Sequence, residues 1–169
     1  GVNVTFGILE KECRASNIRF FTFHEKKRPY IILKWAESQD GYIAPKTKQE
    51  QKPVWITNVF SRQIVHKWRS EEQAILVGTQ TVIDDNPKLN VRDWVGKNPV
   101  RFVLDQNNRI PKESHIFDNQ ARTIVFSSAE IDFSRNIAIQ IADFLFKNNI
   151  QSVLIEGGKQ TIQTFIDAN

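Results

Sequence analysis

The residues best placed to do chemistry lie in the segment SVLIEGGKQT, residues 152–161. An apolar run ends there in Glu156, and Gly157 and Gly158 lead directly into a predicted helix. Glycines at a strand-to-helix turn let backbone N–H groups approach a phosphate, and the positive end of the helix dipole adds attraction. The pattern predicts an anion-binding turn, with a plain tight turn as the alternative. The GxGxxG motif of ordinary Rossmann domains is absent.

Glu156 itself is a candidate catalytic carboxylate. It stands at the carboxyl end of a predicted central strand, which is the edge where open α/β sheets bind ligands. A carboxylate at that edge can orient a substrate hydroxyl or amide, or take part in proton transfer. The alternative is a strand end that is simply solvated.

A second polar segment, VGTQTVIDDNPKLNVR, follows another apolar run. Thr79 and Thr81 are candidates to contact phosphate or ribose, or alternatively to cap a helix. The neighbouring acids Asp84 and Asp85 are of types that bind metals or transfer protons. Adjacent side chains on a loop usually point in different directions, however, so we expect no metal there.

Three basic residues have informative positions. Lys34 lies within an apolar strand, so it must find an anionic partner or reach water. Arg69 ends a predicted helix and Arg92 follows the DDNP loop. Both can clamp a phosphate through bidentate contacts worth ~1.5–3 kcal/mol each when desolvated, unless they are ordinary solvated charges.

These residues need a scaffold, and the hydrophobic pattern predicts an α/β sheet covered on both faces. A predicted helix begins after a cap at Thr57 or Asn58, another surrounds Ile137–Leu145, and a last one follows the diglycine. An amphipathic helix is expected within residues 10–23, and the charged run HEKKRP places a boundary near Arg28. The apolar runs predicted as strands are residues 30–36, 74–78, 101–105, 123–127 and 152–156.

Composition limits the function classes. The net charge of +4 comes from basic residues spread among acidic ones along 169 residues, which suits an anionic small molecule at least as well as nucleic acid. No run of ~18 apolar residues predicts a membrane span. The single Cys13, the scattered histidines and the lack of a secretory signal favour a cytoplasmic protein without a bound metal.

Taken in order, RPYIILKWAESQDG, WITN, HKWRSEEQAILVGTQTVIDDNPKLNVR, NPVRFVLD and SVLIEGG resemble the reductase domain of the bifunctional riboflavin biosynthesis deaminase/reductase. Residues 1–28 resemble the end of that family's deaminase domain and its linker, and residues 29–169 its reductase domain. The resemblance implies a dihydrofolate reductase-like three-layer α/β/α sandwich. The family's reductase domain continues with further strands, so we expect these to be missing after residue 169.

The resemblance also implies an activity. NADPH would reduce 5-amino-6-(5-phosphoribosylamino)uracil to 5-amino-6-(5-phosphoribitylamino)uracil by hydride transfer to C1′ of the sugar. The family commonly forms homodimers through this domain. The zinc-binding motifs of the deaminase are absent, so deaminase activity is not expected.

The family's binding residues transfer position by position. Its NADP contacts fall on Ala36, Trp55, Thr81, Asp85, Gln106 and the turn Gly158, Lys159, Gln160, Thr161 through Thr164. Its substrate contacts fall on Arg69, Leu89, Arg92 and Glu156. We expect Lys34 and Glu156 to flank the reacting sugar and Asp85 to order the cofactor side. Pro53 stands where the family often has a small polar residue that contacts substrate.

Two other functions fit parts of the pattern. One is a related dihydrofolate reductase-like enzyme that acts on a pterin, for which the phosphate-clamping role of Arg69 and Arg92 would be unnecessary. The other is an inactive nucleotide-binding or interaction domain. NADPH oxidation with the phosphorylated substrate distinguishes these functions from the reductase.

Overall fold

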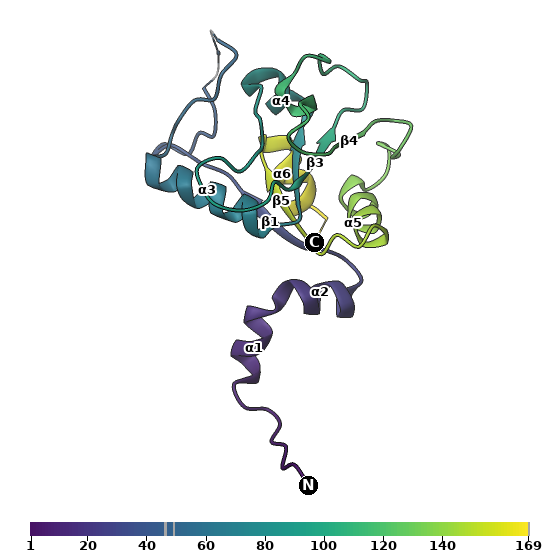
Figure 1. Ribbon diagram of the computed structural model, residues 1–169. Helices are drawn as coiled ribbons and strands as arrows, with labels where there is room; N and C mark the ends of the chain where they lie inside the picture. Colours follow the sequence, from purple (N-terminus) through teal and green to yellow (C-terminus); the bar gives the residue numbers. More distant parts are fainter. Residues whose placement is uncertain (46, 49, 169) are drawn as a thin grey trace.

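A parallel sheet of strand order β1-β5-β2-β3-β4 organises the computed structural model, which describes residues 1–45, 47–48 and 50–168 (Figure 1). Each neighbouring pair is parallel, so the carboxyl ends of the strands lie at one edge. The strands are β1 (Tyr30–Lys34), β2 (Ala74–Gly78), β3 (Val100–Leu104), β4 (Thr123–Phe126) and β5 (Ser152–Glu156).

Helices and loops bury both faces of the sheet. Alternate side chains of the central strands, such as Leu76 and Phe102, pack against α5 (Ile137–Lys147) and α6 (Lys159–Ile166). The intervening side chains, such as Ile75 and Val103, pack against α4 (Thr79–Asp85) and the short 3-10 helix His115–Phe117. This confirms the predicted α/β sheet covered on both faces, and it explains why the strand sequences are continuously apolar.

The predicted strand limits are close to those in the structure. β2 and β5 match their predicted ranges, while β3 and β4 end one residue earlier than predicted. The first strand was predicted to reach Ala36 but ends at Lys34, because its last paired position is Lys34 opposite Glu156. Beyond Glu156 the neighbouring strand turns at the diglycine and offers no further partner.

The N-terminal segment forms two short helices in place of the single one expected over residues 10–23. These are α1 (Glu10–Ser16) and α2 (Ile18–Lys26), separated by the non-helical backbone of Asn17. α1 buries no residue and projects away from the sheet (Figure 1). α2 is attached to the rest of the fold, because the rings of Phe23 and Phe146 lie 4.8 Å apart and Arg19 pairs with Glu72.

α3 (Val59–Glu71) connects the first two strands and has an unusual orientation. Asn58 caps it by accepting a hydrogen bond from the Ser61 N–H at 3.0 Å, as one of the two predicted caps. Its buried side chains are His66 and Arg69, whereas Phe60 and Ile64 are exposed. The polar face of α3 is therefore the one that reaches the carboxyl edge of the sheet.

Candidate functional site

The candidate site begins where β1 and β5 end together. Lys34 and Glu156 are directly paired residues of the two strands, and the Lys34 Nζ lies 4.0 Å from Glu156 Oε2. The Lys34 side chain is 24% exposed. As expected for a lysine in an apolar strand, it has both an anionic partner and access to solvent.

Glu156 is held by a bidentate ion pair from α3. The Nε and Nη2 atoms of Arg69 each donate to one carboxylate oxygen at 2.8 Å, and Nη1 donates to the carbonyl of Asn90 at 3.3 Å. Burial raises the pKa of Glu156, but the adjacent Arg69 outweighs it and keeps that pKa below its ordinary value. Burial also opposes the charge on Arg69, but Glu156 raises its pKa above the ordinary value. Both groups are therefore charged at neutral pH.

The diglycine turn leaves backbone donors available at the same edge. Gly157 has φ +70°, and an added Cβ there would meet nothing within 4 Å. The N-cap residue of α6 is Gly158, which has no side chain to cap the helix, whereas Asn58 and Asn136 cap α3 and α5. Unpaired N–H groups at a helix N-terminus attract anions. The turn is thus open at Gly157, and the first N–H groups of α6 have no partner within the helix itself.

Two threonines fix how α4 and α6 lie at this turn. The Gly158 N–H donates to Thr81 Oγ1 at 2.9 Å, so Thr81 supports the turn. A Cβ at Gly78 would lie 2.5 Å from Thr161 Oγ1, so α6 packs closely over the end of β2. Larger residues at Gly78 would push the two helix starts apart.

A second basic group is contributed by the segment that follows Leu89. Arg92 is exposed, and its Nη1 donates to Asn90 Oδ1 at 3.1 Å. Partial burial and the nearby Arg69 charge lower the pKa of Arg92. Arg92 forms no ion pair with any carboxylate in the described part of the chain. A bound anion would relieve the repulsion between the two arginines.

Several other residues expected to bind ligands have structural roles as well. Asp85 forms an ion pair with Lys48, whose Nζ also donates to the Lys52 carbonyl at 3.1 Å. The Asp85 carboxylate, which we expected on the cofactor side, is therefore already paired with Lys48. Trp55 is exposed, with the guanidinium of Arg62 5.5 Å from its ring centroid.

Leu89 is only 2% exposed and packs in the core, with φ +48°. Any contact that it makes with substrate would come from its backbone. Ala36, by contrast, is half-buried just beyond β1, at the carboxyl edge.

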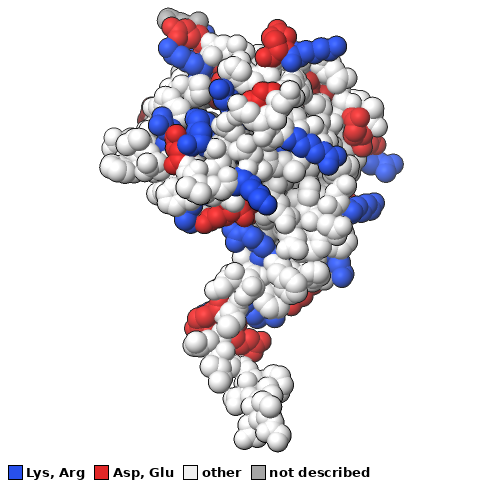
Figure 2. Space-filling view, viewed as in Figure 1, with Lys and Arg blue, Asp and Glu red and all other residues white. Residues whose placement is uncertain are grey.

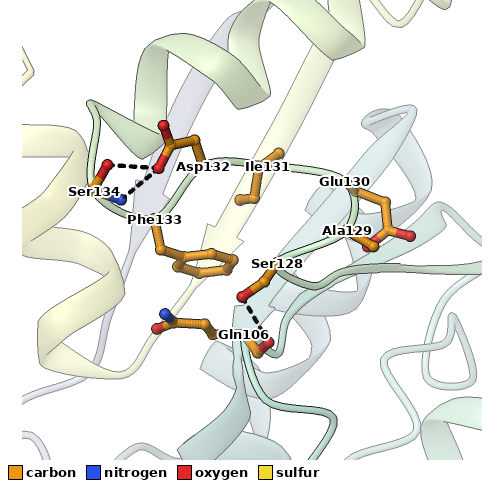
Figure 3. Close-up of a pocket in the computed structure, with 8 residues that line it drawn as sticks. All are labelled: Gln106, Ser128, Ala129, Glu130, Ile131, Asp132, Phe133 and Ser134. Carbon is orange, nitrogen blue, oxygen red and sulfur yellow. Dashed lines mark hydrogen bonds between the residues drawn. The ribbon is translucent and has the colours of Figure 1, made fainter.

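Gln106 and the residues after β4 form a shallow hollow at the same edge of the sheet. Its volume is about 460 Å³, and Gln106 and residues 128–134 line it (Figure 3). Ser128 Oγ donates to the Gln106 carbonyl at 3.1 Å and joins the two loops. The side chains of Lys159 and Gln160 are exposed at the start of α6, while Thr161 is buried.

Charges of both signs are interspersed over the visible face, without a basic stripe (Figure 2). Within the described residues, no group of three or more histidine, cysteine, aspartate or glutamate side chains is arranged to hold a metal. None of the helices in that same part of the chain is both long and apolar enough to span a membrane.

Sequence reasoning missed three polar residues at the centre of the site. His66 is 1% exposed, and its Nδ1 lies 3.3 Å from the backbone nitrogen of Arg92. Asp93 pairs with Arg62 at 2.8 Å, and Asn90 contacts both Arg69 and Arg92. The available signal was the spacing of Arg62, His66 and Arg69 at positions i, i+4 and i+7 of one helix face.

Comparison with known proteins places the chain in a family. Residues 29–169 match the family model described as the RibD C-terminal domain. The riboflavin biosynthesis protein RibD of Aquifex aeolicus is 35% identical over 98% of this chain, and that of Actinobacillus pleuropneumoniae is 35% identical over 94%. These matches cover 50% and 47% of the two relatives, so the chain spans about half of their length.

Similar structures and a shorter relative add to this comparison. A Thermotoga maritima diaminohydroxyphosphoribosylaminopyrimidine deaminase/5-amino-6-(5-phosphoribosylamino)uracil reductase has a TM-score of 0.83 at 35% identity. The match covers 96% of this chain and 48% of that one. The 2,5-diamino-6-ribosylamino-4(3H)-pyrimidinone 5′-phosphate reductase of Archaeoglobus fulgidus is 28% identical over 84% of this chain and 76% of its own length. The neighbours confirm the expected dihydrofolate reductase-like fold.

Proposed function

The chain belongs to the RibD C-terminal domain family, and from this and its site we propose that it is an NADPH-dependent reductase of riboflavin biosynthesis. Its substrate would be 5-amino-6-(5-phosphoribosylamino)uracil and its product the phosphoribityl compound. The observation that carries the proposal is the convergence at one sheet edge of the Arg69–Glu156 pair, Lys34 and the open turn at Gly157. Two adjoining ligands, one a dinucleotide and one a sugar phosphate, would meet there.

The turn after β5 has the features that a dinucleotide pyrophosphate requires. Gly157 leaves its Cβ space empty, and α6 presents N–H groups that no side chain caps. Thr81 holds the Gly158 amide in place from the neighbouring helix. We assign the pyrophosphate to this turn and the nicotinamide end to the region of Ala36 and Trp55.

On the substrate side we assign the phosphate to Arg92. Arg69 already uses two donors on Glu156, so it is less available for a phosphate than the sequence alone suggested. Arg92 is exposed and has no carboxylate partner among the described residues. Its guanidinium matches a phosphate monoester in geometry and charge.

The remaining polar groups orient the sugar. NADPH, when bound, supplies the hydride that reduces C1′. Glu156, kept ionised and immobile by Arg69, accepts hydrogen bonds from sugar hydroxyl or amine groups. Lys34 lies 4.0 Å from Glu156 and is the group that can donate a proton where the ring opens.

Four further features belong to the same proposal: NADPH as the preferred dinucleotide, a cytoplasmic location, a homodimer formed through this domain, and a boundary between domains near residue 28. Phe23, which lies before that boundary, packs against Phe146 of α5, with the two ring centroids 4.8 Å apart.

The direct test is NADPH oxidation, followed by absorbance, with the phosphoribosylaminouracil as substrate. Glu156→Gln keeps the shape of the side chain but removes its charge, so turnover should fall about 100-fold. Its NADPH dissociation constant, measured by tryptophan fluorescence, should change less than about twofold because the carboxylate faces the substrate. Loss of NADPH affinity in this variant would refute the assignment of Glu156 to the substrate side.

The phosphate assignment has its own matched pair of variants. Arg92→Gln should raise KM for the phosphorylated substrate about 10- to 100-fold, since one charge-assisted bidentate contact is lost. Arg135→Gln removes an arginine whose side chain is 78% exposed and serves as the control. Equal KM values for the two variants would exclude Arg92 as the phosphate ligand.

A further inference from the structure

The inward face of α3 carries a polar row that the proposed reaction does not fully use. Arg62, His66 and Arg69 lie at positions i, i+4 and i+7, so they point to the same side of the helix. Arg69 holds Glu156. Among the described residues, His66 makes no hydrogen bond to Glu156 or to Lys34. His66 is nevertheless 1% exposed, and its ring faces the segment that contains Arg92.

The contacts of His66 determine which of its nitrogens carries hydrogen. The Arg92 backbone N–H donates to Nδ1 at 3.3 Å, so Nδ1 must be the unprotonated nitrogen. Burial, assisted by Arg69 and Arg92, lowers the pKa of His66 to about 4, and the ring is neutral at pH 7. The hydrogen is then on Nε2, which lies 3.5 Å from Asp93 Oδ2.

Residues 90–93 have no regular secondary structure, and polar contacts hold them at several points. The Asn90 carbonyl accepts from Arg69, and Asp93 pairs with Arg62 at 2.8 Å. His66 binds the backbone between these two points, at Arg92 itself. The direction in which the Arg92 side chain leaves the backbone therefore depends on His66.

We propose that His66 is a positioning residue that fixes the backbone of Arg92 so that its guanidinium meets the phosphate of a sugar-phosphate substrate. The inference rests on the proposed function for the identity of the substrate. It assigns to His66 an effect on the binding of phosphate-bearing ligands and none on the binding of the dinucleotide. A histidine that only filled space would not distinguish these two ligands.

Three variants separate hydrogen bonding from space filling. In His66→Asn the amide oxygen lies at the depth of Nδ1 and can still accept from the Arg92 N–H. In His66→Gln the amide lies one bond further out, at the depth of Nε2, and leaves that N–H unpaired. In His66→Leu the space is filled but no acceptor is present.

The probes are ribose 5-phosphate, ribose and NADPH, titrated into the whole chain by NMR or calorimetry, together with the kinetics of substrate reduction. We expect His66→Gln and His66→Leu to weaken ribose 5-phosphate binding and raise KM about tenfold, as for one lost buried hydrogen bond. His66→Asn should stay within about threefold of the unmodified chain, and kcat and NADPH affinity should change little in all variants.

The outcomes separate the two levels of inference. An unmodified chain that binds ribose 5-phosphate more tightly than ribose but reduces no substrate would refute the proposed function, and the binding data alone would then decide the role of His66. Equal sugar-phosphate affinity in His66→Asn and His66→Gln would overturn that role. So would an unmodified chain that does not distinguish ribose 5-phosphate from ribose. If His66→Leu does not fold, the Asn and Gln variants still provide the test.

Discussion

Helices α3 and α5 both lie beside the sheet, but they bury opposite kinds of side chain. α5 buries Ala138, Ile141, Ala142 and Leu145, as an amphipathic helix on a hydrophobic core does. α3 buries His66 and Arg69 and leaves Phe60, Ile64 and Trp68 exposed. Each helix begins with an asparagine cap, so the difference lies in their faces and not in how they start.

The difference separates the part of the molecule that stabilises the fold from the part that positions ligands. The inward contacts of α3 are charge-assisted hydrogen bonds with strict geometry, as between Arg69 and Glu156. Those of α5 are apolar contacts, which are strong and tolerant of direction. Substitutions on α5 should therefore act on stability alone, and those on the inner face of α3 on both stability and ligand binding.

The largest effect should come from Glu156→Ala, which leaves Arg69 buried and without its partner. Breaking a buried ion pair from one side costs about 3–5 kcal/mol. Urea unfolding of this variant should show that loss, and the double change Arg69→Met with Glu156→Leu should recover much of it. A loss below about 1 kcal/mol for Glu156→Ala would mean that the pair is effectively solvated.

Next in size is Leu145→Ala on α5. The side chain is fully buried in the larger core cluster, so the cavity should reduce the free energy of unfolding by about 3 kcal/mol. Ile139→Ala on the same helix is the control, because Ile139 is 53% exposed and should cost less than about 1 kcal/mol. Sugar-phosphate affinity should be the same for both variants, and a change in Leu145→Ala alone would contradict the division between the helices.

A smaller effect is expected from acidification, through His66. Its pKa is lowered from 6.5 to about 4 in the folded chain, so the unfolded chain binds more protons between those values. The stability that His66 contributes is therefore present above about pH 6.5 and is lost as the pH falls towards 4. Between pH 7 and pH 5 the loss should be about 2 kcal/mol.

His66→Asn cannot titrate, so its stability should fall less over the same interval. Urea unfolding of the unmodified chain and of this variant at pH 7 and pH 5 gives the difference directly. Parallel losses in the two proteins would show that His66 is not kept neutral by its surroundings.

The smallest effect should follow Ile64→Ala on the outer face of α3. Its side chain is 47% exposed, so the change should alter stability by less than about 1 kcal/mol. Urea unfolding should be measured for both Ile64→Ala and Leu145→Ala. The two losses of stability compare the outer face of α3 with the inner face of α5. A loss as large as that of Leu145→Ala would mean that the apolar side of α3 is covered in solution.

The strands could be predicted because each is a short apolar run, and the central strands β2, β3 and β5 are buried on both faces. β2 ends at Gly78 and β5 at the diglycine, so their limits were marked by residues as well as by hydrophobicity. The lysine in β1 was also informative, since the need for an anionic partner pointed to what is now its contact with Glu156. The same argument, applied to Arg101 in β3, would have predicted an anionic partner for its buried side chain, and the structure shows that this partner is Asp118 at 2.7 Å.

The orientation of α3 could not be predicted from its own sequence. Its apolar residues recur at helical spacing, which ordinarily indicates the buried face, yet the polar face is buried here. The cause is the Arg69–Glu156 pair, whose members lie 87 positions apart, and the docking of Arg92 on His66. Such contacts depend on tertiary structure, so the spacing of Arg62, His66 and Arg69 shows that they share one helix face but not that this face is the buried one.

The most direct test of the site is to follow backbone amide resonances while NADPH is added to the chain. We predict the largest shifts at Gly157, Gly158 and the first turn of α6, with smaller ones at Thr81. Subsequent addition of ribose 5-phosphate should then shift Arg92 and leave those amides nearly unchanged. Dinucleotide binding that leaves the Gly157–Gly158 turn unperturbed, with shifts confined to residues 128–134, would contradict the placement of the cofactor on which the proposed function depends.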